Sequence, residues 1–283
     1  MRTTLLVVLA FVVVFAISCA APTPTPIATS TALTVSKVQE IKTRGKLIVA
    51  VRQGEPLKGV HLDPANNQTR GLEVALAKAI AKKLLGDENK VEIRSGPARD
   101  VVSTVQGGQV DLGLGTIFHS PTTDALKQQV EVSEPFATGG VTLITKIGGV
   151  SIVKDLDGKK VASIDVGRDL RPEFETFAKQ RGFTIAIEQF ASYDEAAAAM
   201  ERGQVQAVLG HTIALTVYMA ESPGRFAFLG KPFTSEQFAV VAKKGDSELV
   251  AIVSQMIKEL KTSGELQRLA QQAGFPVESL ALP

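Results

Sequence analysis

Two kinds of stretch alternate along the chain from about residue 46 onward. Short, nearly continuous apolar runs such as KLIVAVR (46–52) are typical of strands buried on both faces of a parallel sheet. Longer stretches such as GLEVALAKAIAKKLLG (71–86) repeat apolar residues at helical spacing, which places Glu73, Lys78 and Lys82 on the expected polar face. Strands that alternate with helices in this way predict a parallel α/β layer.

The predicted elements occur twice in the same order. The first set comprises strands at 46–52, 91–94 and 110–115 and helices at 71–86 and 100–107. The second set comprises strands at 159–165, 184–190 and 205–210 and helices at 172–181 and 193–202. The phrase GQVQAVLGHT at Gly203 nearly repeats GQVDLGLGT at Gly108, 95 residues earlier. We therefore expect the same structural step in two successive domains.

A final strand at 236–245 and two helices, at 247–263 and 264–273, are too few for a third domain. We expect them to return to the first lobe, so that the chain crosses between lobes near 136–140 and near 237–239. The predicted fold class is α/β with two lobes, each a mostly parallel sheet flanked by helices. Lobe one is predicted at 36–136 plus 240–283, and lobe two at 140–236.

The N-terminus has a different pattern. Met1 and Arg2 precede an apolar run of 13 residues and then SCAAP, which is typical of an export signal, predicted here at 1–18. The run is shorter than the ~18 residues that a membrane-spanning helix needs. A Pro/Thr-rich stretch follows and predicts an extended linker at 19–35.

Cys19 is the only cysteine, which excludes an intramolecular disulfide. The stretch AISC resembles the lipobox of bacterial lipoproteins, although Ala16 stands where leucine is usual. This resemblance implies that Cys19 is acylated and that the protein is anchored by lipid to the cell membrane on its extracytoplasmic side. The alternative is ordinary signal cleavage, with Cys19 incidental.

The composition and charge of the chain limit the kinds of partner that it is expected to bind. A net charge of +2, with 45% hydrophobic and 21% charged residues, is ordinary for a globular protein and gives no bias toward nucleic acid. The three histidines, His61, His119 and His211, match no metal-binding spacing. We therefore expect neither a metal nor a cofactor.

Ligand-binding residues are expected at the carboxyl ends of the predicted strands and beside helix N-termini, where open α/β sheets bind small molecules. The candidates are Arg52, Gln53, Arg99, Gly115, Thr116, His119, Gly167, Arg168 and His211.

Seven short motifs occur in an order that resembles the family 3 extracellular solute-binding proteins. They are GKLIVAV, GLEVALAKAIAKKL, VQGGQVDLGLGT, VEVSEPF, DLDGKKVA, RGQVQAVLGH and FAVVAKKGDSEL. The resemblance extends from about Lys46 to the end of the chain. It implies a type II periplasmic-binding-protein fold whose two lobes close on a solute by hinge motion. It further implies a monomeric receptor that delivers a small polar solute, such as an amino acid, to the permease subunits of an ABC importer.

Two positions depart from the pattern of this family. Its amino acid receptors usually carry an arginine, before a VDFSDPY-like segment, that pairs with the ligand's carboxylate. This chain has no arginine between Arg99 and Arg168, and Leu126 stands at that place in an apparently lengthened loop, SPTTDALKQQ. The acidic residue that binds the ligand's ammonium is replaced by His211.

These departures favour an organic anion that lacks an α-ammonium, with Arg52, Arg168 and His211 as the main contacts. Binding of an anion should then strengthen as the pH falls and His211 gains a proton. An alternative is that Arg99 rebuilds the carboxylate site from another direction.

Two other function classes compete with a receptor. The fold is similar to that of cyclohexadienyl dehydratase, so a dehydratase-like enzyme is the alternative function, but no carboxylate and histidine are evidently placed as an acid and base pair. We therefore expect no enzyme activity. A sensory module is disfavoured because no signalling domain follows the last predicted helix.

Overall fold

The computed structural model describes residues 35–283 apart from 53–59, 64–67, 98–99, 120–121, 165–168 and 283. The description further excludes the side chains of 52, 60–63, 68–70, 116–119 and 122–123. The predicted signal peptide, Cys19 and the linker up to residue 34 lie outside the described residues. None of the helices in the described ranges is long and apolar enough to cross a bilayer.

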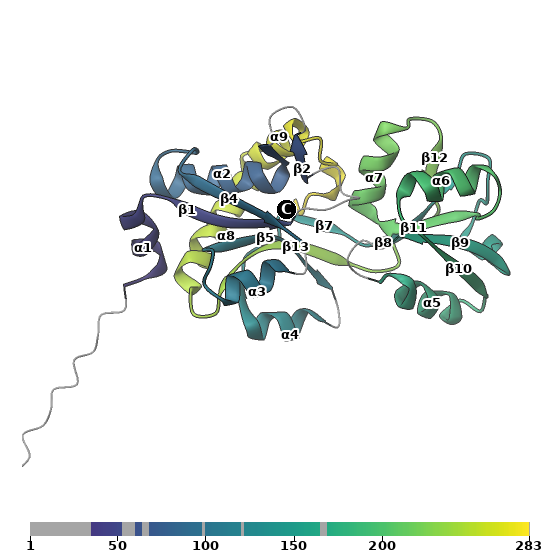
Figure 1. The fold of residues 1–283 in the computed structure, drawn as a ribbon, viewed down its shortest axis with the longest axis horizontal. Coiled ribbons are helices and arrows are strands. Elements are labelled where there is room, and N and C mark those ends of the chain that lie inside the picture. Colours follow the sequence, from purple (N-terminus) through teal and green to yellow (C-terminus); the bar gives the residue numbers. More distant parts are fainter. Residues whose placement is uncertain are drawn as a thin grey trace, which may run out of the picture. The chain divides into compact units, whose positions relative to one another are not determined.

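The first of two large sheets, called sheet one, has the strand order β4-β1-β5-β13-β6, with β7 also paired to β13 (Figure 1). Its strands are β1 (Leu47–Arg52), β4 (Val91–Gly96), β5 (Leu112–His119), β6 (Val130–Val132), β7 (Ala137–Gly139) and β13 (Glu236–Lys243). Strand β1 runs parallel to β4 and β5, whereas β13 runs antiparallel to β5, β6 and β7. Its helices are α1 (Lys37–Arg44), α2 (Leu72–Leu85), α3 (Asp100–Gln106), α4 (Thr122–Gln129), α8 (Ser247–Thr262) and α9 (Glu265–Gln272).

The second, called sheet two, has the order β10-β9-β11-β8-β12. Its strands are β8 (Val141–Lys146), β9 (Lys159–Ile164), β10 (Ile185–Phe190), β11 (Ala207–His211) and β12 (Phe226–Phe228). Helix α5 (Arg171–Gln180) lies on one face, and α6 (Tyr193–Glu201) and α7 (Thr212–Glu221) lie on the other (Figure 1). Short helices η1 (Val153–Leu156) and η2 (Val277–Ser279) and a hairpin of β2 (Val60–Asp63) and β3 (Gln68–Gly71) complete the described elements.

The α/β fold class is confirmed, but both sheets are mixed rather than mostly parallel. Strands β13 and β8 are the exceptions in the interior of the sheets, since each runs antiparallel to its neighbour. Both adjoin a connection between the sheets, so each enters its sheet from the opposite end to the strands of the strand–helix–strand units. Residues 237–239, where a crossing is expected, are already paired with β5 in sheet one, and the chain passes between the sheets through 229–235.

Several elements are absent from the sequence-based prediction. Helix α4 occupies most of the stretch expected to be a long loop, and α7 begins directly after β11 with no intervening turn. The α7 segment TIALTVYMA is almost wholly apolar, and most of its side chains are buried, so it carries no amphipathic helical pattern. Helix α1 is capped at its N-terminus by Ser36, whose hydroxyl accepts from the backbone N–H of Gln39, and at its C-terminus by Gly45 in the left-handed region.

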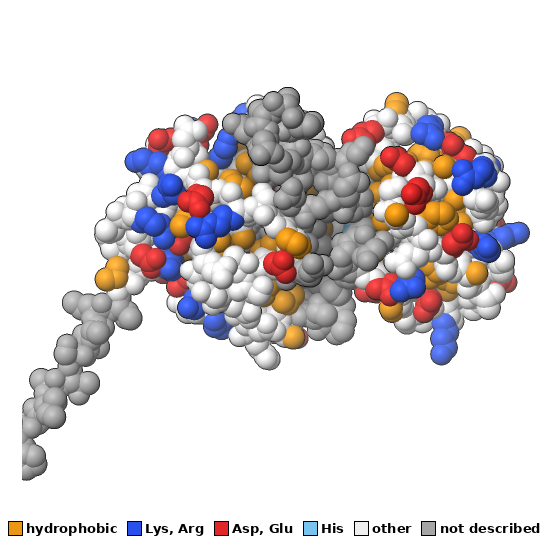
Figure 2. Space-filling view, in the orientation of Figure 1, with side chains coloured by type: hydrophobic (Ala, Val, Ile, Leu, Met, Phe, Trp, Pro, Cys, Tyr) orange, Lys and Arg blue, Asp and Glu red, His pale blue; other side chains and the backbone are white. Residues whose placement is uncertain are grey.

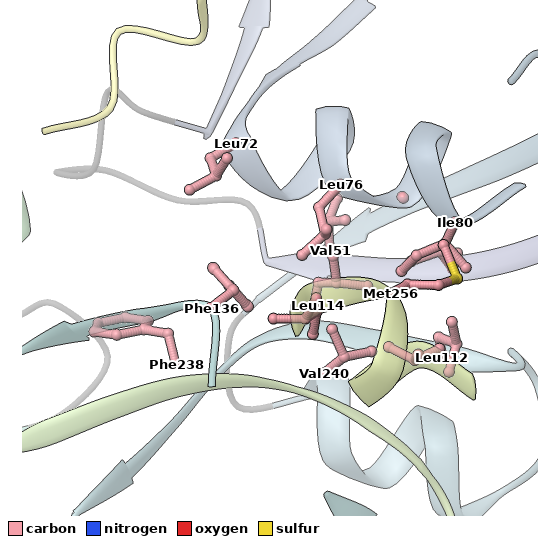
Figure 3. Packing of buried hydrophobic residues seen from close by; sticks show 14 of the residues in the cluster. Val51, Leu72, Leu76, Ile80, Leu112, Leu114, Phe136, Phe238, Val240 and Met256 are labelled. Atoms are coloured by element: carbon pink, nitrogen blue, oxygen red, sulfur yellow. The ribbon is translucent and has the colours of Figure 1, made fainter. Parts of the chain in front are cut away.

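The main hydrophobic core lies between sheet one and helices α2, α8 and α9. Val51, Leu114 and Val240 project from three neighbouring strands toward Leu76 of α2 and Met256 of α8 (Figure 3). Helix α8 contacts β13, and α9 contacts α2, so the last two helices pack on sheet one. Each large apolar side chain buried here contributes about 1.5 to 3 kcal/mol relative to an exposed one. On the surface, acidic and basic side chains are mixed over the face shown in Figure 2.

A buried acid joins α1 to the edge of this core. Asp111, at 3% exposure, accepts hydrogen bonds from the backbone N–H of Ile48 at 2.8 Å and from the guanidinium of Arg44. The backbone N–H of Asp111 in turn donates to the carbonyl of Ile48 at 2.8 Å. Asp111 thereby fixes the start of β5 beside β1 and holds α1 at this end of the sheet.

Candidate functional site

The repeated phrase forms equivalent strands in the two sheets. Gly108 follows α3 with φ 67°, and Gly203 follows α6 with φ 75°. The strands that follow, β5 and β11, lie parallel to β1 and β9, respectively. The prediction that the phrase marks the same structural step twice is therefore confirmed.

The glycine near the end of the first copy, Gly115, has no room for a side chain. Its φ is 81°, and a Cβ atom there would lie 2.5 Å from Oε1 of Glu73. Glu73 was expected on the polar face of its helix, but its side chain is only 4% exposed and faces this strand. It stands in the first turn of α2, where the positive end of the helix dipole favours a carboxylate. Burial of Glu73 thus requires glycine at position 115.

The equivalent glycine in the second copy, Gly210, is enclosed by a tyrosine. A Cβ atom at Gly210 would lie 2.5 Å from the hydroxyl of Tyr193 and 3.0 Å from Cγ of Leu215. The Tyr193 hydroxyl finds no hydrogen-bond partner among the described residues, and its burial raises the pKa of the phenol. These contacts press the end of β11 against α6 and α7, which fixes the backbone that carries His211.

His211 is the last residue of β11 and the N-cap of α7. Its side chain is 6% exposed, and its Nδ1 atom lies 2.9 Å from Oε2 of Glu236. The next residue, Thr212, donates from its backbone N–H and its hydroxyl to the carbonyl of Gly140, at 2.8 Å and 2.9 Å. The end of β11 is therefore joined both to the start of β8 and to the start of β13.

Glu236 is completely buried and begins β13. In register it stands between His119 of β5 and Gly139 of β7. Glu236 is not among the predicted site residues, because it is the first position of the apolar run EQFAVV and matches the start of a strand. The sequence pattern that could have indicated Glu236 is an acidic residue at the first position of an otherwise apolar strand, next to the predicted crossing at 237–239.

The pairing fixes what the imidazole can do. Where Glu236 is ionised, its carboxylate only accepts hydrogen bonds, and Nδ1 of His211 then carries the proton between the two side chains. The other ring nitrogen, Nε2, is then an acceptor in the neutral ring and a donor in the protonated ring. An acid, expected to be lost at this place, therefore stands behind the histidine.

The two connections between the sheets meet at this point. Gly140 lies between β7 and β8, and a Cβ atom there would overlap the carbonyl of Thr234 and lie 2.9 Å from Cβ of Pro232. The hydroxyl of Thr234 accepts from the backbone N–H of Val141 at 2.7 Å. Residues of both connections thus pack closely beside the His211–Glu236 pair.

Of the predicted site residues, only Gly115 and His211 have described surroundings. Thr116 and His119 belong to β5 and Arg52 ends β1, but their side chains lie outside the description. Gln53, Arg99, Gly167 and Arg168 lie outside the described residues altogether. Leu126, predicted to stand at the usual arginine position, packs in α4 against the core formed by valines such as Val101 and Val105.

Comparison with known proteins places this arrangement in a family. Residues 47–274 match the bacterial extracellular solute-binding proteins, family 3. The ABC transporter glutamine-binding protein GlnH of Bacillus subtilis is 26% identical over 231 residues, which cover 81% of each chain. The L-cystine-binding protein TcyJ of Escherichia coli K12 is 22% identical over 237 residues, covering 83% of this chain and 85% of that protein.

A solved structure agrees with these relatives. An ancestral cationic amino acid solute-binding protein superposes with a TM-score of 0.68 and 26% identity, covering 84% of this chain and 99% of that one. The family match spans both sheets, both connections and the ends of β5 and β11. The chain belongs to the bacterial extracellular solute-binding proteins, family 3.

Proposed function

We propose that this protein is the extracytoplasmic receptor of an ABC importer and that it delivers a small, amino-acid-like solute to the permease subunits as a monomer. The observation that carries the proposal is the His211–Glu236 pair, at the carboxyl end of β11 and beside the end of β5. Strand ends of this kind are the usual binding places of α/β folds. The relatives named above bind glutamine, L-cystine and cationic amino acids by their names, which supports the amino acid class.

The proposed solute contact is a hydrogen bond from the solute's ammonium to Nε2 of neutral His211. Under this proposal the carboxylate of Glu236 accepts from Nδ1 of His211. The pair then presents an acceptor at Nε2, backed by a buried negative charge. The preference for an organic anion that the sequence suggests rests, at this position, on His211 alone, without this carboxylate. Under the proposal, Glu236 provides the charge and His211 provides the contact.

A second solute class, an organic anion, is favoured by a different observation. Leu126 belongs to a core, and the segments that carry Arg52, Arg99 and Arg168 stand at predicted strand ends. A protonated His211 would donate from Nε2 to a carboxylate, with its charge balanced by Glu236. The dehydratase-like alternative has no supporting observation, since the relatives named above are binding proteins by name.

The pH dependence of binding separates the two solute classes. An ammonium needs an acceptor at Nε2, so protonation of His211 at acidic pH should weaken amino acid binding at least about tenfold. Protonation should strengthen the binding of an organic anion instead. Calorimetry on the purified protein, after a thermal-shift screen of amino acids and organic acids, measures both.

The matched control for this experiment is His211→Gln, whose amide still donates to Glu236 but does not gain a proton in acid. Its amino acid affinity should be nearly independent of pH. An equal pH slope in the variant would show that another group is responsible. A screen in which no amino acid and no organic acid stabilises the protein would instead overturn the receptor function itself.

We further infer that the two sheets are the two lobes, 36–136 plus 240–283 and 140–236, and that they close on the solute by hinge motion. The antiparallel pairing of β13 with β5 and β7, together with the tight packing at Gly140, supports hinge positions at the two connections. Pairing of Glu236 and the next three residues with β5 moves the inferred second hinge to 229–235.

Lipid anchoring is proposed from the export signal and the AISC stretch. Mass spectrometry of the mature protein should find Cys19 as its N-terminal residue, carrying acyl chains, and a Cys19→Ser variant should lose the anchor. An intact Met1, or an unmodified Cys19 thiol in the mature chain, would contradict the proposal. Solute affinity of the variant should be unchanged, since Cys19 precedes the family match at residue 47.

A further inference from the structure

A cavity of about 620 Å³ opens on the α5 face of sheet two. Among the residues that line it are Phe177, Phe183, Phe233, Lys154, Arg181 and Lys231. Its volume lies within the range of about 300 to 1,000 Å³ that is usual for small-molecule sites. Its lining includes Pro232 of the connection at 229–235 but neither His211 nor Glu236, so it is not the solute site proposed above.

The apolar part of this cavity is a cluster of phenylalanine rings. Phe177 of α5 stacks on Phe233 with ring centroids 4.8 Å apart, and Phe174 lies 5.4 Å from the same ring. Phe183 meets Phe177 edge to face at 6.3 Å. Phe174 and Phe183 are buried, whereas Phe177 and Phe233 are half-buried and border the cavity. The rings form a well-packed apolar wall that remains partly exposed to solvent.

The charged part of the lining is entirely basic. Lys154 of η1, Arg181 after α5 and Lys231 after β12 contribute side chains, and none of the lining residues is acidic. Within the described part of the chain, the charged groups of Lys154, Arg181 and Lys231 make no hydrogen bond or ion pair. Arg181 instead lies over the ring of Phe177, 5.2 Å from its centroid.

One acid lies near enough to Lys154 to interact with it electrostatically. Hydrogen bonds from Thr184 hold the pKa of the Asp157 carboxyl below its ordinary value, and the charge of Lys154 contributes least. Asp157 accepts from both the backbone and the hydroxyl of Thr184 at 2.9 Å. Asp157 is therefore engaged elsewhere, and Lys154 remains available to a ligand.

We propose that this cavity binds an amphipathic organic anion, with its apolar body among the phenylalanine rings and its acid group facing Lys154, Arg181 and Lys231. Apolar burial against rigid rings supplies affinity, and three cations with no acid in the lining select for negative charge. Cations near aromatic faces are also well placed to contact a planar acid group. The proposal is independent of the solute class that the importer receptor carries.

The experiment compares an acid with its uncharged analogue. Calorimetry on the purified protein should show saturable binding of 4-phenylbutyrate, and at least about tenfold weaker binding of 4-phenylbutan-1-ol, which has the same apolar body. The triple variant Lys154→Gln, Arg181→Gln, Lys231→Gln should weaken the acid at least about tenfold and leave the alcohol unchanged. All three side chains are exposed, so the variant should keep its melting temperature.

A matched control removes the same number of positive charges from sheet one's helices. The triple variant Lys42→Gln, Lys82→Gln, Lys258→Gln should bind 4-phenylbutyrate as the unchanged protein does. Equal loss of affinity in both triple variants would overturn the site and leave only a net-charge effect. Equal affinity for acid and alcohol, or no saturable binding of the acid, would overturn it as well. If the acid shows no saturable binding, an acidic, apolar protein segment would become the better candidate occupant of the cavity.

Discussion

Glu236→Gln is expected to weaken solute binding by about 30-fold to several-thousandfold, equivalent to roughly 2 to 5 kcal/mol. The glutamine amide is nearly isosteric with the carboxylate, and its oxygen still accepts from Nδ1 of His211. The substitution therefore removes the negative charge while it keeps the imidazole oriented. Because Glu236 is completely buried, little water is present to replace that charge for a bound ammonium.

Calorimetry with the best amino acid from the thermal-shift screen measures this effect. Glu188→Gln, which removes an exposed acid paired with Lys160 on β9, is the control and should leave the affinity unchanged. A melting curve of each variant is needed, since loss of a buried charge can even raise stability. Unchanged or tighter amino acid binding in Glu236→Gln would contradict the proposed role of the pair and favour the anion class.

Asp111→Ala is expected to lower the free energy of unfolding by about 2 to 4 kcal/mol. The substitution leaves the backbone N–H of Ile48 and the guanidinium of Arg44 without their buried acceptor, and it empties the position that joins α1 to β1 and β5. For a domain of this size the melting temperature should fall by roughly 2 to 4 °C per kcal/mol.

Chemical denaturation measures the free energy directly. Asp111→Asn retains an acceptor for Ile48 but loses the charge, so it should cost less than the alanine variant. Asp124→Ala, at an exposed position on α4, is the control and should change stability by less than about 0.5 kcal/mol. An alanine variant as stable as this control would show that the network contributes little.

The order of the elements was predictable because strands and helices have recognisable local patterns of apolar and polar residues. A nearly continuous apolar run placed β1, helical spacing placed α2, and the repeated order of elements placed β5, β9 and β11, each within a few residues of the observed bounds. The repeated phrase at Gly108 and Gly203 predicted the equivalence of β5 and β11. Helix α7 was not predicted, because a segment buried on nearly all sides has no polar face and therefore no helical pattern of apolar and polar residues.

The partners of the site residues were not predictable from local pattern. Glu236 follows His211 by 25 residues, and their side chains meet only because β13 enters sheet one antiparallel to β5 while β11 ends beside Gly140. The burial of Glu73 is a similar case. Helical spacing predicted an exposed side chain, but the absence of a side chain at Gly115 leaves space for the carboxylate in the interior.

The sequence by itself determined the family, the α/β class and the repeated strand order, because each depends on residue identity or on short-range periodicity. It also predicted that His211 stands where this family usually has an acid. Only the tertiary structure decided that a buried carboxylate stands behind that histidine, and that three cations and a phenylalanine cluster enclose one cavity. Contacts of this kind arise from strand pairing and helix packing, which bring together side chains from distant segments of the chain.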